Sequence, residues 1–132
     1  MKNAVVTGAG GGIGACITEL AVNLGYRVAA IDMRSDSVNE LADRLDNVIP
    51  LVADITDPES VRQAFDALGC APDLLVNNAG LVRFGPLEDL AAQDFQDVVN
   101  VNLVGSFIVA KEAAARMKTA GSGAIVNITS MG

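Results

Sequence analysis

The chain has 132 residues, of which 51% are hydrophobic and 19% charged, so it is long and apolar enough to form one folded domain. Its 16 acidic and 9 basic residues give a net charge of −7, and only 4% of residues are aromatic. This acidic balance argues against nucleic acid or an anionic membrane surface as a partner. The absence of histidine excludes a Ser-His-Asp triad and removes the commonest zinc ligand, so we expect no metal site.

Targeting and redox features are few. No apolar run approaches the roughly 18 residues of a membrane-spanning helix, and the N-terminus does not resemble a signal peptide. The two cysteines, Cys16 and Cys70, form no CxxC pair and no metal-ligand pattern. We therefore expect a cytoplasmic protein without a membrane segment, in which both thiols are reduced and buried.

Strands and helices alternate along the whole chain. Continuous aliphatic and β-branched runs predict parallel strands buried on both faces, at residues 4–7, 27–31, 48–53, 74–77 and 124–129. Ser37 and Glu40 form a capping box that predicts a helix start, and Asp57-Pro58 predicts another start, with Gly69 ending that helix. A longer helix is predicted over residues 92–118. The pattern predicts an α/β domain with a parallel sheet and right-handed crossovers.

Glycine or polar residues come directly after each predicted strand. Because the carboxyl ends of parallel strands share one edge of the sheet, these residues are expected to converge where such sheets bind ligands. The turn from Thr7 to Gly14 contains five glycines and opens a helix, whose free N–H groups and dipole suit a pyrophosphate. A purely structural glycine turn is the alternative. A Walker A loop is excluded because the turn has no Gly-Lys-Ser/Thr sequence after it.

Asp32 lies 18 residues after Gly14, where the second predicted strand ends. A carboxylate at this place can accept hydrogen bonds from an adenosine ribose and repels a 2′-phosphate, which favours NAD over NADP. Arg34 could shift the preference toward NADP. Alternatively, Asp32 is simply an acidic residue before the next helix.

These motifs together resemble those of the short-chain dehydrogenase/reductase family, and the resemblance covers essentially the whole chain. Residues 7–14 match its TGxxxGIG turn, Asp73 to Gly80 contain its NNAG segment, and residues 125–130 match the strand that ends in its catalytic serine. The resemblance implies a Rossmann-type doubly wound sheet over residues 1–132 in the order 3-2-1-4-5, without the family's last strands. It assigns cofactor contacts to Gly8, Gly12, Ile13, Gly14, Asp32, Asp54, Ile55, Asn78, Ala79 and Gly80.

The resemblance also implies catalytic roles for Asn102 and Ser130. Asn102 falls on the predicted inward stripe of the long helix, where a polar side chain needs a partner or a purpose. A satisfied core asparagine is the alternative there, and a strand-terminating turn residue is the alternative for Ser130. Asn100 falls on the opposite face, as expected for a solvated side chain.

The implied activity is NAD-dependent hydride transfer between an alcohol and a carbonyl compound, in a homodimer or homotetramer formed through the long helix. The family's general acid/base lies in a Tyr-x-x-x-Lys motif about a dozen residues after the serine, and residues 1–132 contain no such motif. Tyr26 cannot replace it, because residue 30 is alanine and Tyr26 precedes the second predicted strand, far from the active edge. We expect the chain to be part of an enzyme roughly twice as long, and inactive alone. The alternatives are a non-catalytic NAD-binding sensor or interaction module, or another nucleotide fold such as a methyltransferase.

Overall fold

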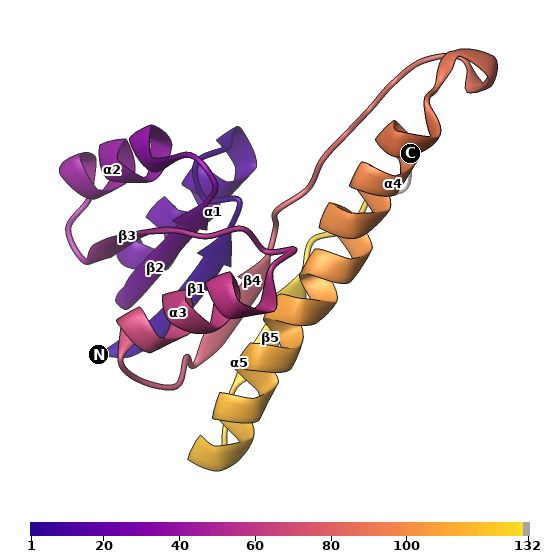
Figure 1. Cartoon of the computed structure of the whole chain (residues 1–132). Helices are drawn as coiled ribbons and strands as arrows, with labels where there is room; N and C mark the ends of the chain where they lie inside the picture. The colour runs from indigo at the N-terminus through magenta and orange to yellow at the C-terminus, as the bar shows by residue number, and fades with distance from the viewer. Residues whose placement is uncertain (131–132) are drawn as a thin grey trace.

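A five-stranded parallel sheet in the order β3-β2-β1-β4-β5 organises the computed structural model, which describes residues 1–130 (Figure 1). The strands are β1 (Lys2–Thr7), β2 (Tyr26–Asp32), β3 (Val48–Val52), β4 (Leu74–Asn77) and β5 (Ala124–Asn127). All four neighbouring pairs are parallel. The predicted sheet and its strand order are thus confirmed, although β5 ends two residues before the predicted boundary.

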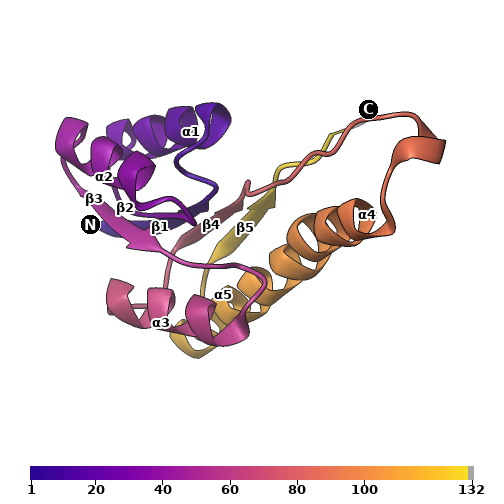
Figure 2. The same ribbon diagram turned by 45° about the horizontal axis from the view of Figure 1, so that its top comes forward.

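Helices cover both faces of the sheet, as Figure 2 shows. One face carries α1 (Gly12–Asn23) and α2 (Ser35–Arg44), and the other carries α3 (Pro58–Leu68) and α5 (Ser106–Ala120). Successive residues of β1 point into different cores, with Ala4 and Val6 on the α1 side and Val5 on the α3 side. This alternation explains why β1, β2 and β4 are apolar, since each is buried on two sides. The prediction of burial on both faces is wrong for the edge strand β5, whose four residues are exposed.

The predicted long helix is three segments rather than one regular helix. It consists of α4 (Ala92–Val99), a π-helical segment (Asn100–Gly105) and α5, after a short 3-10 turn at Leu87–Asp89. The predicted inward stripe is correct in α5, where Val109 and Ala113 are buried, but wrong in α4, which buries no residue. The wider π turns shift the helical phase, and α4 projects beyond the sheet in both views (Figures 1 and 2).

The helical run Ala92–Ala120 is long and apolar enough to span a membrane by length and composition alone. The sequence interpretation overlooked this run because charged residues interrupt it. In the fold, however, Val109, Ala113 and Met117 pack into the core that α5 shares with α3 and the sheet. Only 17% of the apolar 18-residue window in this run is buried, so the core contacts cover a small part of it. One such helix is by itself weak evidence of a membrane span.

The helix starts confirm one sequence prediction and correct another. The Asp57 carboxylate accepts a hydrogen bond from the Glu59 N–H at 3.1 Å, and Gly69 ends α3 in the left-handed conformation, as expected. The capping box at Ser37 is wrong, because α2 begins two residues earlier at Ser35. Ser37 lies within the first turn instead, and its hydroxyl donates to the Arg34 carbonyl at 2.9 Å.

The cysteine prediction is also corrected in part. Both cysteines are free thiols, but Cys16 is exposed on α1 and Cys70 is partly buried beside the end of α3. An exposed Cys16 is consistent with its helix, since α1 buries only Gly14, Thr18 and Ala21.

Candidate functional site

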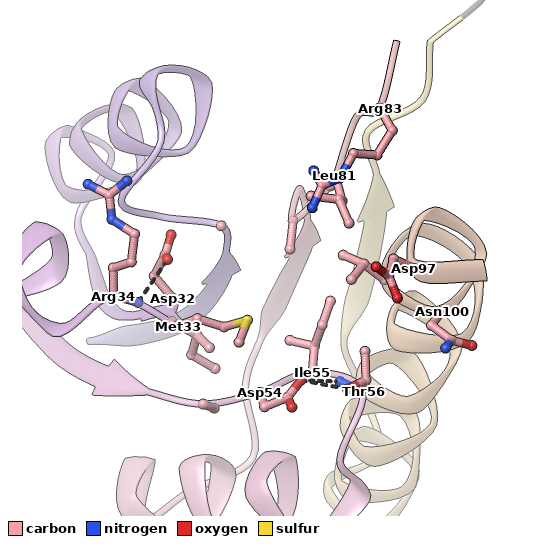
Figure 3. A pocket seen from close by; sticks show the side chains of 16 residues that line it. Asp32, Met33, Arg34, Asp54, Ile55, Thr56, Leu81, Arg83, Asp97 and Asn100 are labelled. Carbon is pink, nitrogen blue, oxygen red and sulfur yellow. Dashed lines mark hydrogen bonds between the residues drawn. The ribbon is translucent and has the colours of Figure 1, made fainter. Parts of the chain in front are cut away.

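A cleft of about 650 Å³ opens at the carboxyl ends of the strands, where the sequence predicted a ligand site (Figure 3). One wall comes from the segments after β1, β2 and β3, and the other from the segment after β4 and the start of the π-helical segment. In Figure 3 Asp32 and Asp54 lie on the first side, and Asp97 and Asn100 lie on the second. The lining residues are Gly8, Ile31, Asp32, Met33, Arg34, Ala53, Asp54, Ile55, Thr56, Ala79, Gly80, Leu81, Arg83, Asp97, Asn100 and Val101.

Hydrogen bonds tie the first glycine turn to the segment after β4. The Thr7 side chain is fully buried, and its hydroxyl oxygen accepts from the backbone N–H groups of Asn78 and Ala79, each at 3.0 Å. In return, the Asn78 amide donates to the carbonyl oxygens of Thr7 and Gly8 at 3.2 and 3.3 Å. The side chain of Asn78 is therefore occupied in bracing the turn, and Asn78 does not line the cleft.

The glycines of the turn serve different purposes. Gly8 has a φ of +63°, and a Cβ there would lie 2.8 Å from the Ala79 Cα. A Cβ at Gly14 would lie 2.0 Å from the Gly8 carbonyl oxygen. A Cβ at Gly12 would meet no atom within 4 Å. Close packing within the protein thus requires Gly8 and Gly14, whereas Gly12 faces open space at the N-terminus of α1.

Two backbone donors hold the Asp32 carboxylate. Its Oδ2 atom accepts from the Gly10 N–H at 3.0 Å, and its Oδ1 atom accepts from the Arg34 N–H at 3.1 Å. Figure 3 shows the second bond and the carboxylate at the edge of the cleft. Because each carboxylate oxygen accepts more than one hydrogen bond, both keep capacity for a ligand hydroxyl.

Asp54 is held in a similar way at the end of β3. Its Oδ1 atom accepts from the backbone N–H and the hydroxyl of Thr56, at 2.9 and 2.7 Å, and its own N–H donates to the Ser60 hydroxyl. The neighbouring Ile55 is buried, and a Cβ at Gly105 would lie 2.7 Å from the Ile55 Cδ1. Glycine in the π-helical segment therefore permits the close packing that fixes this side of the cleft.

Asn102 is satisfied, but not in the core as the helical stripe predicted. It is exposed in the π-helical segment, where its Oδ1 accepts from the Leu81 N–H at 2.7 Å and its Nδ2 donates to the Leu81 carbonyl at 2.9 Å. This double contact fixes the backbone directly after Gly80, and π-helical turns occur often at functional sites. Asn102 thereby shapes the cleft wall without lining it.

Ser130 is exposed beyond the end of β5 and does not line the cleft. Its strand is held by Asn77, which is 5% exposed and whose amide donates to the Asn127 Oδ1 at 3.2 Å and to the Ser106 carbonyl at 3.1 Å. Asn77 therefore joins β4, β5 and the start of α5. The same junction reaches Asn102, because the Ser106 hydroxyl donates to the Asn102 carbonyl at 2.9 Å.

The cleft gathers six of the ten predicted cofactor residues: Gly8, Asp32, Asp54, Ile55, Ala79 and Gly80. Gly12, Ile13 and Gly14 lie at the start of α1, where Ile13 is 66% exposed, and Asn78 lies directly after β4. The sequence reasoning missed several lining residues, among them Met33, Thr56, Asp97 and Val101. Asn100 is exposed, as predicted for a solvated side chain, and it also lies at the cleft wall, which was not predicted. The position of Asn100 at the start of the π-helical segment gave no readable signal.

Charges of both signs line the cleft. The positive charges are those of Arg34 and Arg83, and the negative charges are the carboxylates of Asp32, Asp54 and Asp97. Among residues 1–130 no group of three or more His, Cys, Asp or Glu side chains is arranged to hold a metal ion. The arrangement suits an elongated ligand that presents hydroxyl donors to carboxylates and lies near a helix N-terminus.

Comparison with known proteins gives a consistent result. The family model described as short chain dehydrogenase matches residues 2–132. The chain is 38% identical over 98% of its length to D-threitol dehydrogenase of Mycolicibacterium smegmatis, covering 52% of that protein. It is 33% identical to an uncharacterized oxidoreductase of Thermotoga maritima and 34% identical to the 3-alpha-(or 20-beta)-hydroxysteroid dehydrogenase of Mycobacterium tuberculosis, again over 98% of the chain and 53% and 52% of those proteins. The chain thus spans about half the length of these relatives.

Proposed function

The chain belongs to the short chain dehydrogenase family, and we propose that residues 1–132 form the dinucleotide-binding part of an NAD-dependent oxidoreductase. Its reaction interconverts an alcohol and a carbonyl compound, both small molecules. The observation that carries the proposal is the Asp32 carboxylate, held at the cleft edge by two backbone donors next to a glycine turn.

The residues of the cleft fit a nicotinamide dinucleotide. Gly12 leaves open space at the N-terminus of α1, which suits a pyrophosphate, and Asp32 retains acceptor capacity for ribose hydroxyls. Asp54 and Ile55 form the adjoining wall, which suits the adenine ring. A 2′-phosphate would bring negative charge toward Asp32, so NADP is the weaker ligand in this proposal.

The nicotinamide supplies the hydride donor or acceptor when it is bound, and the protein supplies position and charge. We assign Asn102 to shaping the active-site wall through Leu81, and Ser130 to hydrogen-bonding the reacting oxygen of the substrate. Residues 1–132 contain no Tyr-x-x-x-Lys sequence. The activity is therefore proposed for the whole protein, with the tyrosine and lysine of that motif as its general acid/base pair.

We propose a homodimer or homotetramer, because apolar side chains remain exposed along the α4–α5 run. Phe95, Leu103 and Phe107 are 70%, 68% and 63% exposed. Several large apolar side chains exposed along one helical run are typical of an association surface. Light scattering behind a sizing column measures the state directly, and a monomer at micromolar concentration would contradict this part of the proposal.

The decisive experiment is calorimetric titration of the protein with NAD and with NADP, repeated with Asp32→Ala. We expect NAD to bind at least about tenfold more tightly than NADP, a difference of about 1.4 kcal/mol, and Asp32→Ala to lose this preference. Equal or tighter binding of NADP refutes the role of Asp32. NAD binding without turnover of any alcohol or carbonyl compound by the whole protein would favour the alternative, a non-catalytic NAD sensor or interaction module.

A further inference from the structure

Gly10, Arg34 and Ser37 form a closed arrangement around the Asp32 carboxylate at the end of β2. Gly10, in the turn after β1, donates its N–H to Oδ2, and Arg34, in the turn after β2, donates its N–H to Oδ1. The Arg34 carbonyl accepts from the Ser37 hydroxyl at 2.9 Å. Ser37 in turn packs directly against Gly10, which closes the ring.

The contact between Gly10 and Ser37 leaves no room for a side chain. A Cβ at Gly10 would lie 2.1 Å from the Ser37 Oγ, 2.6 Å from the Ser37 Cβ and 3.0 Å from the Asp32 Oδ2. The φ of Gly10 lies outside the left-handed region, so backbone conformation alone does not require glycine here. Glycine is required at position 10 by the close approach of the two turns.

We propose that Gly10 and Ser37 are positioning residues that lock the Asp32 carboxylate in place and thereby set the discrimination of the site between NAD and NADP. The inference rests on the proposed function, since it concerns how the same cleft chooses its dinucleotide. Neither residue is a fixed position of the TGxxxGIG motif, and neither is assigned a contact with the ligand.

The lock restricts the movement of the Asp32 side chain. An aspartate side chain without hydrogen-bond partners can rotate away from an approaching 2′-phosphate, and the only free-energy cost is that of the rotamer change. The locked carboxylate must first give up two charge-assisted hydrogen bonds from backbone donors, which themselves cannot follow it. The lock therefore keeps the negative charge where it excludes a second negative charge.

Arg34 provides a positive charge beside Asp32 that a 2′-phosphate can use once the lock is open. Its side chain is 74% exposed, and its Nε atom lies 3.9 Å from the Asp36 carboxylate, a distance at which the ion pair is weak. The guanidinium is thus available to pair with a phosphate. Releasing Asp32 should consequently raise the affinity for NADP as well as lower that for NAD.

The test compares four forms of the protein expressed from its complete gene: wild type, Gly10→Ala, Gly11→Ala, and Gly10→Ala combined with Ser37→Gly. Each is titrated calorimetrically with NAD and NADP, and folding is checked by far-ultraviolet circular dichroism. Gly10→Ala should lower the ratio of the NADP to the NAD dissociation constant about tenfold, the worth of one hydrogen bond to a charged group. The double variant removes the obstructing side chain but also the hydroxyl that binds the Arg34 carbonyl, so it should recover part of the wild-type ratio.

Gly11→Ala is the matched control, because a Cβ there meets only the Gly8 carbonyl oxygen at an ordinary 3.5 Å. In Gly11→Ala the ratio of the NADP to the NAD dissociation constant should stay at the wild-type value, and any loss of affinity should be equal for the two dinucleotides. An unchanged ratio in Gly10→Ala, an equal change in Gly11→Ala, or no recovery in the double variant each overturns the proposal.

Two further outcomes are a Gly10→Ala variant that does not fold and a wild-type protein that binds no dinucleotide. If Gly10→Ala does not fold, Ser37→Ala serves in its place, since it deletes only the hydroxyl that holds Arg34, and an unchanged ratio there refutes the lock. If wild-type protein binds neither dinucleotide, the proposed function itself is wrong. Wild-type protein that prefers NAD, with variants that keep its ratio, refutes the lock alone.

Discussion

Two glycines of the first turn should respond in opposite ways to the same substitution. A Cβ at Gly14 would lie 2.0 Å from the Gly8 carbonyl oxygen and 2.7 Å from its carbon, both backbone atoms. A Cβ at Gly12, two residues earlier in the same helical turn, would meet nothing within 4 Å. The pair therefore separates the needs of the fold from those of a ligand.

The expected changes in stability come from these contacts. Gly14→Ala should lower the free energy of unfolding by about 3 kcal/mol or more, because a backbone carbonyl cannot rotate out of the way. Gly12→Ala should raise it by about 0.5–1 kcal/mol, since alanine loses less conformational freedom at a helical position. At about 4 °C per kcal/mol, the melting temperatures should move down by about 12 °C and up by about 2–4 °C.

The assay is urea and thermal unfolding followed by far-ultraviolet circular dichroism, combined with titration of each folded variant with NAD. Although Gly12→Ala is at least as stable as wild type, it should bind NAD at least about tenfold more weakly, because its methyl group occupies the approach to the helix N-terminus. A loss of stability in Gly12→Ala as large as that in Gly14→Ala would refute this reasoning. Unchanged NAD affinity in Gly12→Ala would show that the pyrophosphate does not bind at this turn.

Three further predictions concern other contacts. Thr7→Val, which keeps the shape but removes the acceptor of two backbone N–H groups, should cost about 1–3 kcal/mol in urea unfolding, and Thr7→Ser should recover most of it. Asn102→Ala should release the Leu81 backbone and accelerate amide hydrogen exchange after β4, while the sheet amides keep their protection. The side-chain hydrogen bond from Arg62 lowers the pKa of Glu59 below its ordinary value of 4.5, so Arg62→Gln should raise that pKa in an NMR titration. Because the folded pKa is the lower one, the stabilisation from Glu59 is present above pH 4.5 and is lost as the pH falls through the folded value, a loss that Arg62→Gln should abolish.

The sheet was predictable from sequence because its physical requirements are local and repeated. A parallel strand buried on both faces must be apolar at every position, and β1 shows this with Val5 facing one core and Val6 the other. The start of α3 was equally readable, since Asp57 caps it through a bond two residues away. The resemblance to a known family then supplied the strand order, which periodicity alone does not determine.

The errors arose where contacts across the fold decide the local structure. Ser37 satisfies the pattern of an N-cap, but α2 begins at Ser35 with Arg34 at the cap position, where the Arg34 N–H donates to Asp32. Similarly, regular helical spacing placed Asn102 on an inward stripe, and the π-helical segment moved it to an exposed position over Leu81. The partner of Asn102 lies 21 residues away in the sequence, so the residues around Asn102 do not reveal it.

In the glycine turn, the positions that the family motif specifies differ from the positions where the structure requires glycine. The family pattern names Gly8, Gly12 and Gly14 alike, yet only Gly8 and Gly14 are required by atoms of the protein itself. Since packing does not explain Gly12, its place in the pattern points to an external group, which is why its alanine variant tests the ligand rather than the fold. Gly10 is not a fixed position of the pattern but is required by Ser37 and Asp32. A glycine that a motif omits can therefore control selectivity, because it determines how closely a second turn approaches the residue that reads the ligand.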